Sequence, residues 1–261
     1  SVLSLCDNLT LLPIYAAREK DTGVVSSAML SEKIPGCYLA KDILNQQQAY
    51  ASYRNDYIEA TKLTNHDEYR TASELGRSTD KCKLAAAILL TAPGEPYIYY
   101  GEELGMYGEQ TNGDEYVRAP MLWGDSYTTA YTDKIDKSAA SNTATVDKQL
   151  EDKNSLLNTY LTFTRLRNTY PALAEGTMNK HPVYNDSNEK NYKSVAAWYM
   201  TKDNEKLLVI HNFGPSSVTL PLTENIEKAI AVLGKAQQSK STNRFTVKLD
   251  KYSSVVYKLA K

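Results

Sequence analysis

The chain changes its pattern of apolar residues near Gly176, and this change constrains its fold more than any other feature. Before Gly176, stretches with helical spacing alternate with short β-rich runs. In the segment Lys81–Thr91, core-facing residues recur at i, i+3, i+4 and i+7, starting from Leu84, and this spacing predicts a helix. The same kind of spacing in Asn154–Thr169 predicts a second helix. Tyr57–Leu63 and Tyr97–Tyr100 predict strands, of which the latter is short and buried. Strands that alternate with helices indicate an α/β fold with a parallel sheet.

After Gly176 the helical spacing stops, and short strands follow one another between turn signals. The predicted strands are Val195–Met200, Lys206–Phe213, Ser217–Leu222, Ala229–Leu233, Arg244–Leu249 and Ser254–Leu259. Apolar residues alternate with polar ones in the last two, which is typical of an antiparallel sheet with one solvated face. We therefore predict two domains: residues 1–176, with a long polar loop at 107–153, and an antiparallel β-sandwich at 177–261.

The composition argues against several classes of function. Lys and Arg number 30 against 31 Asp and Glu, so the chain has no basic surplus to neutralise a nucleic acid backbone. The longest apolar stretch, Leu84–Ala92, is far shorter than the roughly 20 residues that a membrane-spanning helix needs. The cysteines Cys6, Cys37 and Cys82 lie far apart without a C-x-x-C pair, so neither a zinc ribbon nor a disulfide framework is indicated.

A histidine and an acid, His66 and Asp67, stand side by side after the predicted strand Tyr57–Leu63. The carboxyl end of a barrel strand is where loops gather over an active site. Cleavage of a glycosidic bond needs two carboxyl groups, together with groups that hold the ring hydroxyls as the sugar approaches an oxocarbenium-like transition state. Asp67 and His66 suit this holding role. The residues alone also allow a second interpretation, a helix-capping Asp67 beside a structural histidine.

Four segments together resemble the α-amylase family, glycoside hydrolase family 13, in their order and approximate spacing. They are LTNHDEYR at Leu63–Arg70, TAPGEPYIYYGEELGM at Thr91–Met106, RAPMLW at Arg118–Trp123 and SLLNTYLTFTRLRNTYPALAEG at Ser155–Gly176. Each segment is a weak signal alone, but the combination is specific. The resemblance implies the C-terminal portion of a (β/α)8 TIM barrel followed by the antiparallel β-sandwich.

The resemblance also implies roles for individual residues. Asp67 matches the family's third catalytic acid, which holds ring hydroxyls in the transition state, and His66 matches a substrate-binding residue beside it. Arg70 is expected near the carboxylates as a fixed counter-charge in the substrate-binding set, and a solvated arginine is its alternative. Asn65 is expected to orient the turn. The implied substrate is an α-glucan such as starch or a maltooligosaccharide.

Other catalytic signatures of the family are absent from the sequence. It holds no G-F-R-x-D segment, which carries the nucleophilic aspartate in the family, and its only Asn-His pair is Asn65-His66. We therefore expect the C-terminal part of a retaining α-glucan hydrolase that is inactive as an isolated chain, with the nucleophile and the general acid upstream of Ser1. One alternative is a non-catalytic glucan-binding or scaffold relic, and another is a self-sufficient hydrolase that pairs Asp67 with Glu102. For Glu102 we expect a structural role.

The remaining expectations concern ligands and surroundings. No cofactor is evident, and the oxygen-rich turn at residues 112–115 lacks the spacing of an EF-hand loop, although the resemblance leaves room for calcium in the full-length protein. His181 and His211 have no partner at metal-ligand spacing, so we expect structural roles. The resemblance favours an extracytoplasmic location, whether secreted, periplasmic or on the cell surface. A partial barrel exposes two sheet edges, so we expect self-association unless residues 1–56 cover them.

Overall fold

The structure is a computed structural model that describes residues 35–124, 142–241 and 244–260. Two compact units divide these residues: one takes Ala60–Leu89 and Pro96–Thr162, and the other takes the remainder. The predicted domain boundary at 176/177 does not coincide with this division, since residues 35–59 cluster with the strands that follow Gly176. Residues 1–34 and 125–141 of the predicted first domain lie outside the described residues.

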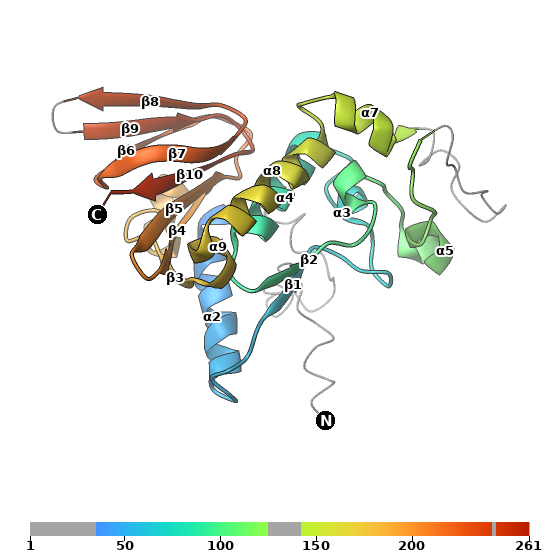
Figure 1. Cartoon of the computed structure of the whole chain (residues 1–261), viewed down its shortest axis with the longest axis horizontal. Helices are drawn as coiled ribbons and strands as arrows, with labels where there is room; N and C mark the ends of the chain where they lie inside the picture. The colour runs from blue at the N-terminus through green and yellow to red at the C-terminus, as the bar shows by residue number, and fades with distance from the viewer. Residues whose placement is uncertain (1–34, 125–141, 242–243, 261) are drawn as a thin grey trace. The chain divides into compact units, whose positions relative to one another are not determined.

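The first unit is built from short strands and helices (Figure 1). Its elements, in chain order, are β1 (Ala60–Lys62), α3 (Thr71–Glu74), α4 (Thr79–Thr91), β2 (Glu95–Tyr97), the 3-10 helices η4 (Glu102–Leu104) and η5 (Gln110–Asn112), α5 (Asp114–Val117), α7 (Val146–Glu151) and α8 (Leu156–Thr169). The end of α4, the first residue of β2 and the second half of α8, from Phe163, belong to the second unit. The two helices predicted at helical spacing are confirmed as α4 and α8, each within two residues at its start.

Helix α4 is buried nearly all round, as its run of apolar residues requires. Leu84, Ala86 and Leu89 are fully buried in it. A second apolar cluster joins η4 and its following loop to α8 and is formed by Leu104, Met106, Ala119, Leu122 and Leu157. This cluster fixes η4, the loop after it and the loop after α5 to helix α8 in the first unit. No helix among the described residues is long and apolar enough to cross a membrane.

The two strands of the first unit differ from their prediction. β1 covers only three residues of the predicted strand at 57–63. β2 begins two residues before the predicted strand at 97–100 and overlaps it only at Tyr97. Tyr97 and Ile98 are 60% and 42% exposed, so the predicted buried strand is wrong. Among the described residues, β2 pairs with β1 alone, and this small sheet leaves the side chains of the apolar run uncovered.

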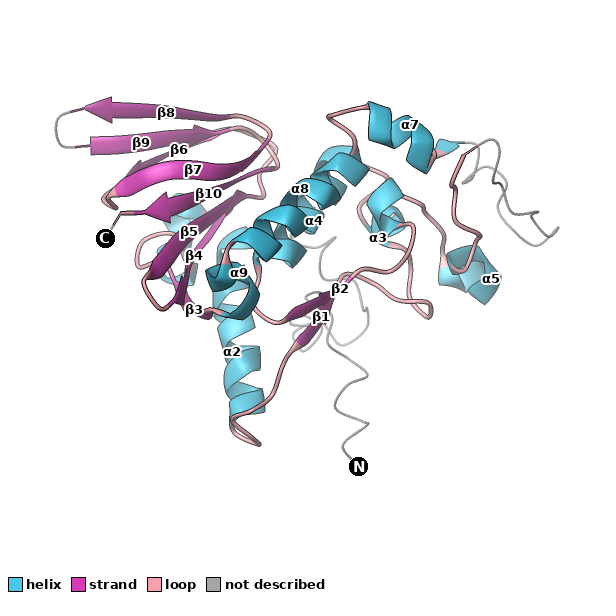
Figure 2. Cartoon of the chain, viewed as in Figure 1, coloured by secondary structure: helices cyan, strands magenta, loops and turns pink. Residues whose placement is uncertain are grey.

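The second unit consists of helices followed by two antiparallel sheets, drawn in magenta in Figure 2. Its elements are η3 (Gly36–Tyr38), α2 (Leu39–Ala51), α9 (Pro171–Glu175), β3 (Thr177–Lys180), η6 (Asp186–Asn188), α10 (Glu189–Tyr192), β4 (Val195–Lys202), β5 (Glu205–Asn212), β6 (Val218–Leu222), β7 (Ile226–Leu233), β8 (Ala236–Ser241), β9 (Arg244–Leu249) and β10 (Ser253–Leu259). One sheet has the order β3-β4-β5-β10-β7 and the other the order β6-β9-β8. The pairings are antiparallel.

The core of the second unit lies between these two sheets, which confirms the predicted sandwich. Val195, Ala197, Leu208 and Ile210 from the larger sheet pack in one buried cluster with residues of the smaller sheet: Leu220, Leu222, Val247 and Leu249. The six predicted strands are present, with small shifts at their ends. Strands β3 and β8 were missed because three of the four β3 residues and most of β8 are exposed, so apolar alternation is absent there.

Arg167 joins the end of α4 to α8 within the second unit. Its guanidinium donates to the carbonyls of Leu90 at 3.3 Å and Ala92 at 2.8 Å, and also to that of Gly94. The last carbonyls of a helix have no partner inside the helix. A single buried arginine therefore satisfies acceptors that α4 and its following turn leave open.

Candidate active site

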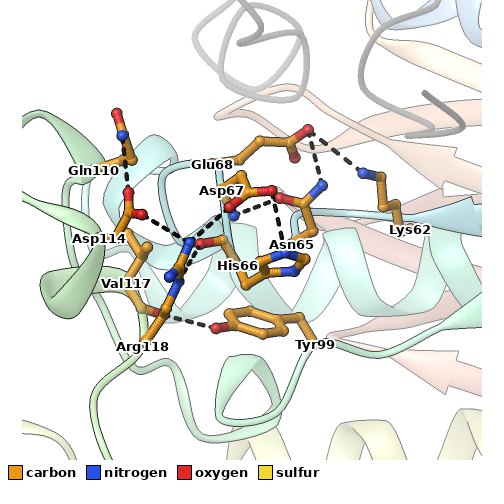
Figure 3. Close-up of polar contacts among 10 residues, drawn as sticks. All are labelled: Lys62, Asn65, His66, Asp67, Glu68, Tyr99, Gln110, Asp114, Val117 and Arg118. Atoms are coloured by element: carbon orange, nitrogen blue, oxygen red, sulfur yellow. Dashed lines mark hydrogen bonds and ion pairs between the residues drawn. The ribbon is translucent and has the colours of Figure 1, made fainter. Parts of the chain in front are cut away.

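The sequence-predicted pair His66 and Asp67 lies on an exposed turn between β1 and α3 (Figure 3). The side chains are 63% and 62% exposed, and His66 Nε2 lies 3.1 Å from Asp67 Oδ2. The backbone N–H of Asp67 donates to Asn65 Oδ1 at 2.8 Å, so Asn65 orients the turn as expected. The capping interpretation of Asp67 is wrong, because α3 begins at Thr71 and its N-cap residue is Arg70.

A cation that pairs with Asp67 comes from a distant part of the chain. Arg118 follows α5, and its Nη2 donates to Asp67 Oδ1 at 2.8 Å (Figure 3). Its Nε donates to the carbonyl oxygen of His66 at 3.1 Å. Nη2 also lies 2.9 Å from Asp114 Oδ2. One guanidinium therefore holds the backbone of His66 and the side chain of Asp67 together.

Sequence reasoning missed this role of Arg118. The residue opens the RAPMLW segment, which served only to recognise the family. Its position at the start of this family segment was the signal that could have marked Arg118 as a site residue. However, the sequence separation between the two segments does not indicate that Arg118 contacts Asp67. Only the folded loop after α5 brings the two together.

Arg70, the third predicted site residue, points into the first unit. It is 1% exposed, so the alternative of a solvated arginine is wrong. Its guanidinium lies over the rings of Tyr99 and Tyr100, at 4.8 and 5.0 Å from their centroids, and Nη1 donates to the Tyr100 carbonyl at 2.8 Å. Burial lowers the pKa of Arg70, and the neighbouring Glu102 opposes that shift. In this structure the ion pair of Asp67 is with Arg118, and the role of Arg70 in substrate binding stays a prediction.

Glu102 is a buried group and does not share the exposed surface of Asp67. It is 3% exposed, and Tyr160 donates its hydroxyl to Glu102 Oε1 at 3.0 Å. Burial raises the pKa of Glu102 to about 8, although the hydrogen bond from Tyr160 works in the opposite direction. A carboxyl group in this setting is held neutral at pH 7, and its contacts support the structural role that the sequence predicted.

The oxygen-rich turn at 112–115 places one of its carboxylates, that of Asp114, in contact with other side chains. Asp114 accepts a hydrogen bond from Gln110 Nε2 at 3.1 Å and forms the ion pair with Arg118. No three His, Cys, Asp or Glu side chains gather at a potential metal site within residues 35–124, 142–241 and 244–260. The predicted structural histidines are both buried: His181 contacts Glu224 at 2.8 Å, and His211 contacts Thr91 at 3.2 Å.

The arrangement around Asp67 offers an exposed carboxylate with hydrogen-bond donors on either side. A carboxylate is an acceptor with about four lone-pair sites, so Asp67 can accept from hydroxyl groups while it is paired with Arg118. The imidazole of His66 can donate or accept beside it. Such a group suits the recognition of neighbouring hydroxyls on a sugar ring, whereas cleavage of a glycosidic bond also requires a pair of carboxyl groups at a defined separation.

Comparison with known proteins agrees with this fold. The family model described as "Alpha amylase, catalytic domain" matches residues 25–176, which is more than half of the chain, and one described as "Alpha-amylase SusG C-terminal domain" matches residues 195–256. The chain therefore belongs to the α-amylase family. Its two matched regions are a part of the family's catalytic domain and a C-terminal β domain.

Two relatives show how much of such a protein the chain represents. It is 67% identical over 224 residues to "Alpha-amylase SusG" of Bacteroides thetaiotaomicron, a match that covers 86% of the chain and 32% of the relative. It is 31% identical over 218 residues to "Alpha-amylase 3" of Dictyoglomus thermophilum, which covers 82% of the chain and 41% of the relative. The chain thus spans about a third to two fifths of the length of these relatives.

Solved structures show the same fold. The crystal structure of an alpha-amylase from H. orenii superposes with a TM-score of 0.74 at 24% identity, over 90% of this chain and 47% of that one. Eubacterium rectale Amy13B gives a TM-score of 0.70 at 25% identity, over 90% of this chain and 46% of that one. The partial barrel and the sandwich are therefore the expected fold of this part of the family.

Proposed function

We propose that the chain is the C-terminal part of a retaining α-glucan hydrolase of the α-amylase type, which acts on starch or maltooligosaccharides. One observation carries this proposal: Asp67 stands exposed between His66 and Arg118, in the segment that matches the family's catalytic domain. The 67% identity to a protein named α-amylase supports the substrate class.

In this proposal Asp67 is the acid that stabilises the transition state. Positive charge develops on the sugar ring as the glycosidic bond breaks, and hydrogen bonds to the ring hydroxyls strengthen at that moment. Asp67 accepts from these hydroxyls, and His66 holds a neighbouring one. Arg118 keeps the carboxylate and the His66 backbone in a fixed relation, so little reorganisation is needed when the transition state forms.

A simple substitution tests this role. We expect maltoheptaose to bind the 261-residue chain weakly in isothermal titration calorimetry, and we expect Asp67→Asn and His66→Ala to reduce that binding. Glu151→Gln is the matched control, because Glu151 is an exposed acid at the end of α7, a helix that supplies none of the contacts described around Asp67. In the full-length protein, the equivalent of Asp67→Asn should lower kcat by on the order of 10²–10³, the effect of removing one group that stabilises transition-state charge. Equal binding by all four proteins would contradict the proposal.

We also propose that the chain by itself does not hydrolyse starch. Both hydrolytic mechanisms need two carboxyl groups on opposite sides of the scissile bond. Glu102, the candidate for the second group, is buried and hydrogen-bonded to Tyr160, which argues against a pairing with Asp67. A reducing-sugar assay on the purified chain should therefore remain at background. Starch hydrolysis that disappears in Asp67→Asn would show that the chain is self-sufficient.

Two exposed residues, one ending β2 and one just after it, support self-association of the isolated chain. Tyr97 and Ile98 are exposed beside the small sheet, and an uncovered strand edge readily pairs with another chain. We expect a dimer in light scattering at tens of micromolar and a shift toward monomer in Ile98→Lys. A monomer in which the amides of Tyr97 and Ile98 exchange freely with deuterated water contradicts this expectation. An extracytoplasmic location, and calcium in the full-length protein, remain expectations from the family.

A further inference from the structure

Two consecutive tyrosines hold the backbone on either side of Arg118. The Tyr99 hydroxyl donates to the Val117 carbonyl at 3.0 Å, as Figure 3 shows, and the Tyr100 hydroxyl donates to the Ala119 carbonyl at 2.8 Å. Val117 and Ala119 are themselves buried, at 0% and 6% exposure. Arg118 is thus the exposed residue between two anchored neighbours.

The two tyrosine rings are held in place by Arg70 and by their contact with each other. The buried guanidinium of Arg70 lies over both rings, and the rings contact each other edge to face with their centroids 4.8 Å apart. Contacts of this kind orient a cation and aromatic faces relative to each other. Burial raises the pKa of Tyr99 to about 12, so its hydroxyl remains a hydrogen-bond donor at neutral pH.

The anchored backbone matters because the Arg118 side chain is exposed. An ion pair between flexible, solvated side chains contributes little, since both side chains lose conformational freedom when they pair. Arg118 nevertheless meets three acceptors together, on Asp67, Asp114 and the His66 backbone. A Cα position fixed from both sides removes part of the freedom that the guanidinium otherwise has to lose.

We propose that Tyr99 and Tyr100 are positioning residues that present the Arg118 guanidinium to Asp67 and to the His66 carbonyl. The contacts form a closed path within the first unit: Arg70 supports the tyrosines, the tyrosines hold the backbone around Arg118, and Arg118 returns to the segment that contains Arg70. The positioning of Arg118 does not depend on the proposed function. Only its consequence, the binding of sugar hydroxyls by Asp67, rests on that function.

Nuclear magnetic resonance of the 261-residue chain tests the positioning directly. The Nε–H signal of Arg118, identified by its loss in Arg118→Lys, should exchange slowly with water because Nε donates to His66. In Tyr99→Phe and in Tyr100→Phe, exchange should be about fivefold faster, the change in an equilibrium that one hydrogen bond of ordinary strength supports. Tyr69→Phe is the matched control: it also removes a tyrosine hydroxyl near the turn, one that contacts Thr111 at 2.6 Å.

A second arginine distinguishes a local effect on Arg118 from a destabilisation of the whole chain. The Nε–H signal of Arg167, a buried arginine in α8, should exchange at an unchanged rate in the tyrosine variants. Faster exchange at both arginines, or an unchanged rate at Arg118 in the doubly substituted chain, overturns the proposal. If the doubly substituted chain does not fold, the single variants decide by the same comparison.

A binding experiment distinguishes this proposal from the proposed function. Maltoheptaose affinity, measured by calorimetry, should fall about fivefold in Tyr99→Phe and Tyr100→Phe, in parallel with the loss of the same hydrogen bonds. If the unsubstituted chain binds no maltoheptaose, the proposed function of Asp67 fails while the exchange rates still test the tyrosines. If it binds and the variants bind equally well, the tyrosines do not position Arg118 for the sugar.

Discussion

Arg118 and Asp67 are 51 residues apart in the sequence, and their side chains meet at 2.8 Å in the folded chain. Both are partly exposed, at 41% and 62% of their side-chain surface, so their ion pair contributes little to stability. Its effect is geometric, since the same guanidinium also holds the His66 carbonyl. The pair therefore fixes the two residues that we assign to the sugar.

We predict that Arg118→Lys weakens glucan binding without unfolding the chain. Lysine keeps the charge but cannot offer the fork of donors that reaches Asp67 and the His66 carbonyl together. Maltoheptaose affinity should fall about tenfold, the loss expected for one charge-assisted hydrogen bond. The free energy of unfolding in urea should change by no more than about 0.5 kcal/mol, as for exposed sites generally. Arg165→Lys, on the exposed side of α8, is the control and should change neither quantity.

We predict that Gly101→Ala is more damaging than Gly76→Ala. Both glycines have positive φ, at 84° and 63°, so both substitutions carry a backbone cost of about 1–2 kcal/mol. A methyl group at Gly101 would also lie 2.4 Å from Met106 Sδ and 3.0 Å from Arg70 Nη1, whereas nothing lies within 4 Å at Gly76. Urea unfolding measures the free energy lost in each variant. The difference between the two losses reports how tightly Met106 and Arg70 pack against Gly101. Equal losses would show that Arg70 and Met106 move aside freely.

Glu102 should make the stability of the chain fall as pH rises. Burial raises its pKa from 4.5 to about 8, so between these values the folded chain keeps a proton that the unfolded chain has released. Stability from this group is complete below about pH 4.5 and is lost as pH rises toward 8. The melting temperature of Glu102→Gln, relative to the unsubstituted chain, should therefore increase across this range.

A second variant checks the cause. The Tyr160 hydroxyl lowers the pKa of Glu102 by its hydrogen bond, so Tyr160→Phe should extend the decline in stability above pH 8. A difference between Glu102→Gln and the unsubstituted chain that stays constant from pH 4.5 to 8 would show that Glu102 ionises normally in the fold.

His211 should make the second unit sensitive to acid. Complete burial lowers its pKa from 6.5 to about 3, so the unfolded chain binds a proton that the folded chain excludes over this range. Stability is then lost as pH falls from about 6.5 toward 3. The fluorescence of Trp198, whose ring centroid lies 4.8 Å from that of His211, reports the unfolding once Trp123→Phe removes the other tryptophan. In His211→Leu the acid-induced loss should be smaller, and an unchanged acid limb would rule His211 out as the cause.

Local pattern was sufficient for most of the secondary structure. Helices α4 and α8 and six strands of the sandwich follow from apolar spacing that the fold then buries, and the exposed strands β3 and β8 give no such spacing. The strand at Tyr97–Tyr100 was misjudged because an apolar run indicates burial only if the rest of a sheet covers it. Recognition of the family came from the order of several short segments, each of which is weak by itself.

The sequence by itself determined the family, the two kinds of architecture and the candidate pair His66 and Asp67, because these depend on residues that are neighbours or regularly spaced in the chain. The tertiary structure decided which charges meet. Arg70, close to Asp67 in sequence, is buried against two tyrosines, while the distant Arg118 pairs with Asp67. Electrostatic and hydrogen-bond partners act over a few ångströms in space, and no local pattern encodes which loop will supply them.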